Sequence, residues 1–195
     1  MNDNHRILLI RHGETEFNRA GRYQGQSDSC LTSLGIRQAR RNGQVVASLV
    51  GSGEEWRFVS SPLGRTLQTA RLIGAEIGLD ASRIELDERI QEIGFGRWEG
   101  LDRASIEARD AGALEARRRD PWNFAMEGGE TMAAVARRAE AWLEGLEGNV
   151  IAVSHGTTGR ILRGLYLGLS REQTLQLDQP QDIVFELGGG RIVRH

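Results

Sequence analysis

Two histidines in this sequence each follow a run of apolar residues and precede a glycine. The run 7–10 leads into Arg11-His12-Gly13, and the run 150–153 leads into Ser154-His155-Gly156. Uninterrupted branched apolar runs are typical of strands that are buried on both faces, as in a parallel sheet covered by helices. Ligands of such sheets bind at the carboxyl ends of the strands, where a glycine lets the backbone approach them closely. We therefore expect His12 and His155 to meet in one pocket.

An arginine and an acid follow two further strand patterns. Arg65 comes after the apolar segment 56–60, in the first turn of an expected helix, and Glu92 comes after a short strand expected at 84–86. Backbone N–H groups and the helix dipole favour an anion at such a helix start. If the strands are parallel, Arg65, Glu92, Arg11 and the two histidines gather at the same edge of the sheet. An electropositive pocket of this kind suits a dianionic phosphoryl group far better than a neutral ligand.

The elements that must position these residues alternate between strand and helix patterns. The strands are expected at 6–11, 56–60, 84–86 and 150–154, with a C-terminal hairpin over 183–193. Helices are expected at 33–49 after the capping residue Thr32, from Ser61-Pro62 onward, and at 104–119, 132–146 and 161–169. This alternation predicts an α/β fold, a three-layer α/β/α sandwich whose mostly parallel sheet ends in an antiparallel C-terminal edge hairpin. We expect a single domain over 1–195, with a short cap-like insertion at about 97–127.

Two polar segments carry less regular patterns. The segment 13–31 is expected to be a long loop, and loops of that length in compact domains are usually functional or disordered. Within the insertion, Arg117-Arg118-Arg119 could bind a phosphate, but we expect a solvated charged face. The only cysteine, Cys30, lies in the polar loop and is expected to be an ordinary loop thiol, not a nucleophile.

Composition excludes several classes of protein. The chain of 195 residues has a net charge of −2, which provides no basic field for nucleic acid or an anionic membrane. All its basic residues apart from histidine are arginines, so no P-loop, Schiff-base or kinase lysine exists. A single cysteine permits no internal disulfide, which favours the cytoplasm, and no apolar run is long enough to span a membrane. The sequence gives no prediction of oligomeric state.

Five short blocks of the chain, taken together, resemble a known family. They are Ile10–Thr15 with Asn18 and Gln24-Gly25 downstream, Ser60–Ala70, Glu92–Gly100, Gly128–Thr131 and Ser154–Gly156. In this order they resemble the histidine phosphatase superfamily, the phosphoglycerate mutase-like proteins, and the resemblance covers residues 6 to about 168.

The resemblance implies a role for each motif residue. His12 would be the nucleophile that carries the phosphoryl group as phosphohistidine, and Glu92 would protonate the leaving oxygen and then deprotonate water. The phosphoryl oxygens would be held by Arg11, Arg65 and a protonated His155, with Asn18 assisting. The substrate would be a small phosphorylated molecule contacted by Gln24, Gly25 and Gly156. No metal or other cofactor is required.

The length of the insertion bears on the type of reaction. The mutase branch carries a longer, basic insertion, so the short segment 97–127 favours a phosphatase, with phosphoglycerate mutase-type transfer as the alternative. A module that binds phosphorylated metabolites but has lost catalysis is a third possibility. A metallohydrolase using His12, His155, Glu92 and Asp28 is disfavoured because the arginines would repel a metal ion. A serine hydrolase is excluded because Ser154 does not lie in G-x-S-x-G.

Overall fold

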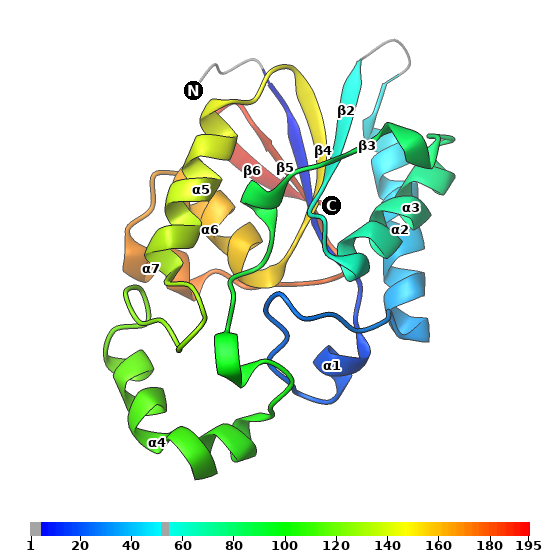
Figure 1. Ribbon diagram of the computed structural model, residues 1–195. Coiled ribbons are helices and arrows are strands. Elements are labelled where there is room, and N and C mark those ends of the chain that lie inside the picture. Colours follow the sequence, from blue (N-terminus) through cyan, green and yellow to red (C-terminus); the bar gives the residue numbers. More distant parts are fainter. Residues whose placement is uncertain (1–4, 52–54) are drawn as a thin grey trace.

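The computed structural model describes residues 5–51 and 55–195 and contains a six-stranded sheet with the strand order β3-β2-β4-β1-β5-β6. The parallel strands are β1 (Ile7–Arg11), β2 (Trp56–Ser60), β3 (Ile84–Leu86) and β4 (Asn149–Ser154). The antiparallel edge is the hairpin of β5 (Val184–Gly188) and β6 (Arg191–Arg194). The predicted mostly parallel sheet with a C-terminal hairpin is therefore confirmed (Figure 1).

The register of the two central strands places the His-Gly pairs side by side. Ile10 of β1 is level with Val153 of β4, and Arg11 is level with Ser154. The backbone N–H of His12 continues the ladder by donating to the Ser154 carbonyl at 3.0 Å. His12 and His155 therefore leave the sheet at the same edge.

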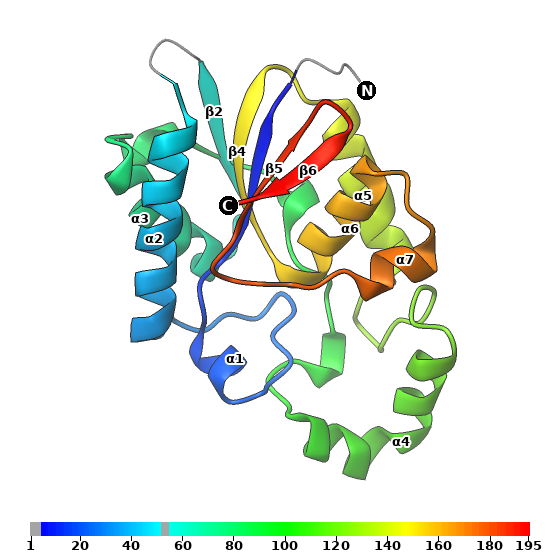
Figure 2. The same ribbon diagram turned by 180° about the vertical axis from the view of Figure 1, so that it is seen from behind.

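Helices cover both faces of the sheet (Figures 1 and 2). One face carries α2 (Ser33–Leu49) and α3 (Gly64–Glu76), and the other carries α5 (Met132–Glu144) and α6 (Gly156–Tyr166), with the short α7 (Arg171–Gln176) beside α6. Leu8 of β1 packs in the core under α2 and α3, whereas Leu9 packs in the core under α5 and α6. Because both faces of β1 are covered, its sequence shows no alternation of polar and apolar residues.

Most element boundaries lie within a few residues of the prediction. The helix α2 spans the predicted residues, and its first turn is capped by Thr32, which accepts the Gly35 N–H. The spacing of Ile36 from Ala39 and Val46 predicts a buried position for all three, but Ile36 is 38% exposed. The buried stripe instead begins at the neighbouring Gly35, one residue and about 100° away around the helix. The helix α7 was not predicted.

Two segments lie beyond the carboxyl ends of the parallel strands (Figure 1). The first is the loop after β1, which contains the one-turn helix α1 (Glu16–Arg19). The second joins β3 to α5 and contains α4 (Arg103–Arg119), which bends at Asp110 and packs Ile106 and Leu114 around Trp98 in a small core of its own. Short 3-10 helices lie at Ala81–Arg83, Glu88–Ile90 and Gly96–Trp98.

No helix in residues 5–51 or 55–195 combines the length and the apolar composition that crossing a bilayer demands.

Candidate active site

His12 is buried just after β1, and its two ring nitrogens have different partners. Nδ1 lies 2.8 Å from the Gly13 carbonyl oxygen, and Nε2 lies 3.2 Å from Nε of Arg65. A carbonyl can only accept and a guanidinium can only donate, so Nδ1 carries the proton and Nε2 keeps its lone pair. Burial lowers the pKa of His12 well below its ordinary value, and the charges of Arg65 and Arg11 lower it further. The ring is therefore neutral, with Nε2 unprotonated.

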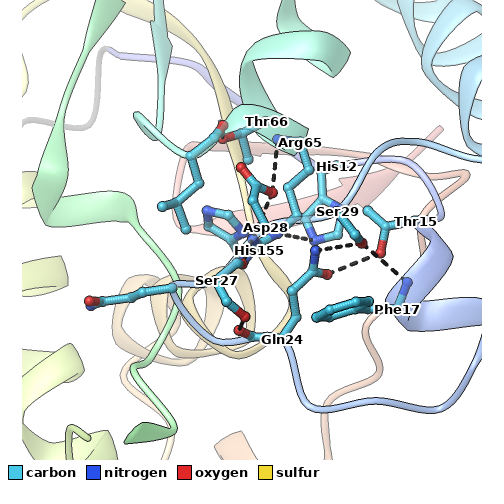
Figure 3. Close-up of polar contacts among 12 residues, drawn as sticks. His12, Thr15, Phe17, Gln24, Ser27, Asp28, Ser29, Arg65, Thr66 and His155 are labelled. Atoms are coloured by element: carbon cyan, nitrogen blue, oxygen red, sulfur yellow. Dashed lines mark hydrogen bonds and ion pairs between the residues drawn. The ribbon is translucent and has the colours of Figure 1, made fainter. Parts of the chain in front are cut away.

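Arg65 is 1% exposed and is held in place by the loop that follows β1. Its guanidinium donates to the carbonyls of Gly25 at 2.6 Å and Ser27 at 2.8 Å, and to the carboxylate of Asp28 at 3.2 Å. Figure 3 shows Arg65 and His12 gathered with Ser27 and Asp28 in one polar cluster. Asp28 thus acts as an ion-pair partner of Arg65, which argues against the role of metal ligand that the metallohydrolase alternative gave it.

Glu92 is buried at the start of α6, where its carboxylate receives the first free N–H groups of the helix. One oxygen accepts the N–H of Thr157 at 3.1 Å, and the other accepts those of Thr158 at 3.2 Å and Ile93 at 3.0 Å. Unpaired N–H groups and the helix dipole favour a carboxylate at this position. The folding of α6 therefore fixes the position of the acid in the site.

His155 occupies the N-cap position of α6, and its ring centroid lies 5.3 Å from that of His12. Its Nε2 is 2.7 Å from the hydroxyl of Ser61, and its Nδ1 is buried without a partner among the described residues. Burial lowers the pKa of His155 well below its ordinary value, and the charges of Arg65 and Arg11 lower it further. The ring is neutral without a ligand, so the protonated form expected from the sequence requires the charge of a bound dianion.

Arg11 also keeps an unused hydrogen-bond donor. Its guanidinium donates to the carbonyl of Gln179, whereas its Nε–H is buried without a partner among the described residues. Burial lowers the pKa of Arg11. A Cβ on Gly156 would lie 3.3 Å from this guanidinium and 2.5 Å from the side-chain oxygen of Gln179, so a larger residue there would displace the Gln179 amide beside Arg11.

The three predicted contacts in the loop after β1 mainly hold that loop. Gln24 is buried, with its amide between the hydroxyls of Thr15 and Ser29 at 3.0 Å each (Figure 3). Gly25 has a φ of +56°, and a Cβ there would lie 2.1 Å from the Glu99 carboxylate. Asn18 accepts the Nε2–H of Gln181 at 2.9 Å.

A pocket of about 300 Å³ opens at the carboxyl edge of the sheet. Seven of the nine predicted site residues line it: Arg11, His12, Asn18, Gln24, Gly25, Arg65 and Glu92. His155 and Gly156 instead line a small adjoining cavity. Among residues 5–51 and 55–195, no cluster of three or more His, Cys, Asp or Glu side chains is placed to hold a metal ion.

Sequence reasoning missed the segment between α7 and β5. Besides the contact of Gln179 with Arg11, Gln181 donates to the His12 carbonyl at 3.2 Å and to Asn18. This segment has no motif and no charge pattern, so nothing in the sequence pointed to it. Arg160 was also missed, and Arg117, expected on a solvated face, lines the pocket.

The sequence model of the histidine phosphatase superfamily, branch 1, matches residues 7–191. The chain belongs to this superfamily. It is 37% identical over 172 residues to a probable phosphoglycerate mutase of Proteus mirabilis, covering 84% of this chain and 75% of that one. It is also 37% identical over 134 residues to a glucosyl-3-phosphoglycerate phosphatase of Mycobacterium tuberculosis, covering 69% of this chain and 56% of that relative.

Solved structures of this superfamily share the fold. The α-ribazole phosphatase of Shigella flexneri superposes with a TM-score of 0.82 at 25% identity, covering 97% of this chain and 94% of that one. A mycobacterial glucosyl-3-phosphoglycerate phosphatase in complex with VO3 superposes with a TM-score of 0.78 at 30% identity, covering 97% and 96%. The resemblance seen in the sequence motifs is thus confirmed over nearly the whole chain.

Proposed function

We propose that the protein hydrolyses phosphomonoesters of small metabolites through a phosphohistidine formed on His12. The observation that carries this proposal is the pair of bonds on the His12 ring. A proton fixed on Nδ1 by the Gly13 carbonyl leaves the Nε2 lone pair beside the guanidinium of Arg65. A neutral nucleophile next to a cation is what attack on a phosphate dianion needs, since transfer depends on positioning and charge neutralisation.

The reaction runs in two steps. In the first, the Nε2 lone pair of His12 bonds to phosphorus, the bond from phosphorus to the ester oxygen breaks, and Glu92, protonated in the complex with the phosphoryl dianion, gives its proton to that oxygen. In the second, Glu92 takes a proton from water, the water oxygen bonds to phosphorus, and the bond from phosphorus to Nε2 breaks. The products are an alcohol and inorganic phosphate, and both side chains return to their starting states.

Two buried nitrogen atoms without partners among the described residues support a phosphate clamp around His12. The buried Nε–H of Arg11 and the buried Nδ1 of His155 are without partners among the described residues, and the guanidinium of Arg65 already faces the nucleophile. A phosphoryl group would satisfy the unused donor of Arg11 and favour protonation of His155. We assign Asn18 to the same clamp, and Gln24, Gly25 and Gly156 to contacts with the substrate. The mechanism requires no metal or other cofactor.

The relatives support the choice of hydrolysis and of small substrates. Two are named phosphatases of glucosyl-3-phosphoglycerate and of α-ribazole, and we infer a small phosphorylated metabolite here as well. The Proteus relative favours mutase-type transfer as a second candidate. The short segment 97–127 favours hydrolysis. We further propose one domain over 1–195 with this segment as a cap, and a cytoplasmic location.

A phosphate-release assay with phenyl phosphate, with and without a chelator, tests this proposal. We expect turnover that survives the chelator and is lost in His12→Ala, because no second nucleophile replaces the imidazole. Loss of turnover with the chelator would support a metallohydrolase. Absence of turnover with retained phosphate binding would support a binding module. Transfer to an added acceptor hydroxyl in preference to water would support the mutase.

A further inference from the structure

The carboxylate of Glu99 accepts three backbone N–H groups, and two of them belong to the loop after β1. One oxygen accepts the N–H of Gln26 at 2.9 Å and that of Phe95 at 3.0 Å, and the other accepts the N–H of Ser27 at 2.8 Å. Two successive N–H groups that converge on one anion form a backbone nest. Because Phe95 comes shortly after Glu92, the carboxylate joins the loop to the segment that carries the acid.

The segment 25–27 turns closely around this carboxylate. Gly25 has a φ of +56°, a conformation that favours glycine, and a Cβ there would lie 2.1 Å from an oxygen of Glu99. The glycine therefore allows the N–H groups of the next two residues to reach the carboxylate.

Arg65 binds the same segment through its carbonyl groups. Its guanidinium donates to the carbonyls of Gly25 at 2.6 Å and Ser27 at 2.8 Å. Its Nε lies 3.2 Å from Nε2 of His12. The segment 25–27 is thus bound by a carboxylate through its N–H groups and by the guanidinium through its carbonyls. A shift of the segment would move the guanidinium away from the nucleophile.

The position of Glu99 is fixed by its two neighbours in the chain. Trp98 is fully buried in the small core beside α4, and the N–H of Gly100 donates to the carbonyl of Tyr23 at 2.8 Å. Glu99 is not among the residues that line the active-site pocket. It therefore contacts the pocket only through the residues that it holds.

We propose that Glu99 is a positioning residue for the phosphate clamp, because it holds the segment 25–27 that places the guanidinium of Arg65 beside His12. This inference rests on the proposed function, which assigns Arg65 to the clamp. Without the carboxylate, the N–H groups of the segment lose their acceptor and must turn toward water. The carbonyls that bind Arg65 turn with them, and small displacements of positioning groups are costly for catalysis.

Phosphate binding and turnover in two variants of Glu99 test the inference. In Glu99→Ala we expect the dissociation constant for inorganic phosphate to rise, and kcat/KM for phenyl phosphate to fall, each about 10- to 10²-fold. Glu99→Gln keeps one acceptor oxygen and should recover part of both losses. Both constants are measured at a temperature at which thermal melting shows the variants to be folded.

Asp80→Ala is the matched control. Asp80 also accepts a backbone N–H, that of Ser82 at 2.8 Å, but it lies between α3 and β3, before the strand begins. Its loss should leave both constants unchanged, even where the melting temperature falls. Equal losses in Asp80→Ala and Glu99→Ala would overturn the inference, because they would show a general effect of stability.

Histidine ¹⁵N spectra separate the inference from the proposed function. The hydrogen bond from Arg65 shifts the signal of the unprotonated Nε2 of His12, and in Glu99→Ala this signal should move toward that of a nitrogen without a donor. If the wild-type protein neither hydrolyses phenyl phosphate nor binds phosphate, the proposed function fails and this signal decides the inference. An unchanged phosphate constant, or an unchanged signal where phosphate does not bind, would overturn it. Glu99→Gln provides the same readouts if Glu99→Ala is unfolded.

Discussion

His12 and His155 have the same sequence surroundings but different hydrogen-bond partners. On His12 the carbonyl of Gly13 fixes the proton on Nδ1, and Arg65 points an N–H at Nε2. In His155, Nε2 contacts the hydroxyl of Ser61 instead, and Nδ1 has no partner among the described residues. Burial lowers the pKa of both rings. In the proposed mechanism, the first ring donates an electron pair and the second receives a proton when the substrate dianion binds.

Glu92→Gln tests the proton carrier. The amide keeps the size of the side chain but cannot give a proton to the leaving oxygen, so kcat for phenyl phosphate should fall about 10²- to 10⁴-fold. The loss in kcat/KM, which reports the first step alone, should be much smaller for 4-nitrophenyl phosphate, whose leaving oxygen needs no proton. Glu88→Gln, at an exposed acid four residues earlier, is the matched control and should keep kcat. A change in KM alone would show that Glu92 does not carry the proton.

At the scale of elements, the sequence predicted those features that depend on residues close together in the chain. The strand runs and the Thr32 cap of α2 depend on neighbouring residues, and both were predicted correctly. The segment between α7 and β5 was missed because its contacts are with residues far away in the sequence. Gln181 donates to the carbonyl of His12, which stands 169 positions earlier in the chain. The expectation for Arg117 was wrong for the same reason, because Tyr23 and Phe95, which hold it, come from other segments. Charge runs alone carry no information about such partners.

Gly13→Ala tests how β1 and α2 together position the nucleophile. A Cβ on Gly13 would lie 2.3 Å from the backbone oxygen of Gly35 in the first turn of α2, so the backbone must move. The Gly13 carbonyl, which holds the His12 proton, would move with it. We expect kcat to fall at least about tenfold and the melting temperature to drop.

Gly112→Ala in α4 is the matched control. A Cβ there meets nothing within 4 Å. Alanine should therefore leave activity unchanged and stabilise the helix by about 0.5–1 kcal/mol. Activity of Gly13→Ala equal to that of the wild type would show that this contact does not position His12.

At the scale of the whole molecule, a chain of net charge −2 concentrates cations at one edge of its sheet. The pocket there is lined by Arg11, Arg22, Arg65, Arg117 and Arg160. Both histidines beside these arginines are buried with lowered pKa values and add no further positive charge to this edge.

The melting temperature should fall as the pH is lowered from 7.5 to 5.5. The pKa values of His12 and His155 are lowered on folding, so the unfolded chain takes up protons near its ordinary histidine pKa of about 6.5 before the folded chain does. Stability is therefore greatest above that pH and declines toward the folded-state pKa. The double variant His12→Asn, His155→Gln should show a flatter profile. An equal slope in the double variant would contradict this account.

The proposed phosphohistidine can be tested for directly. The protein is mixed briefly with a ³²P-labelled phosphomonoester and denatured, and the labelled residue is mapped by mass spectrometry. We predict a label that is stable in base and labile in acid, located on His12, absent from His12→Ala, and accumulating in Glu92→Gln when the leaving group is 4-nitrophenolate. A label on a serine, or steady turnover with no covalent label at all, would contradict the central claim.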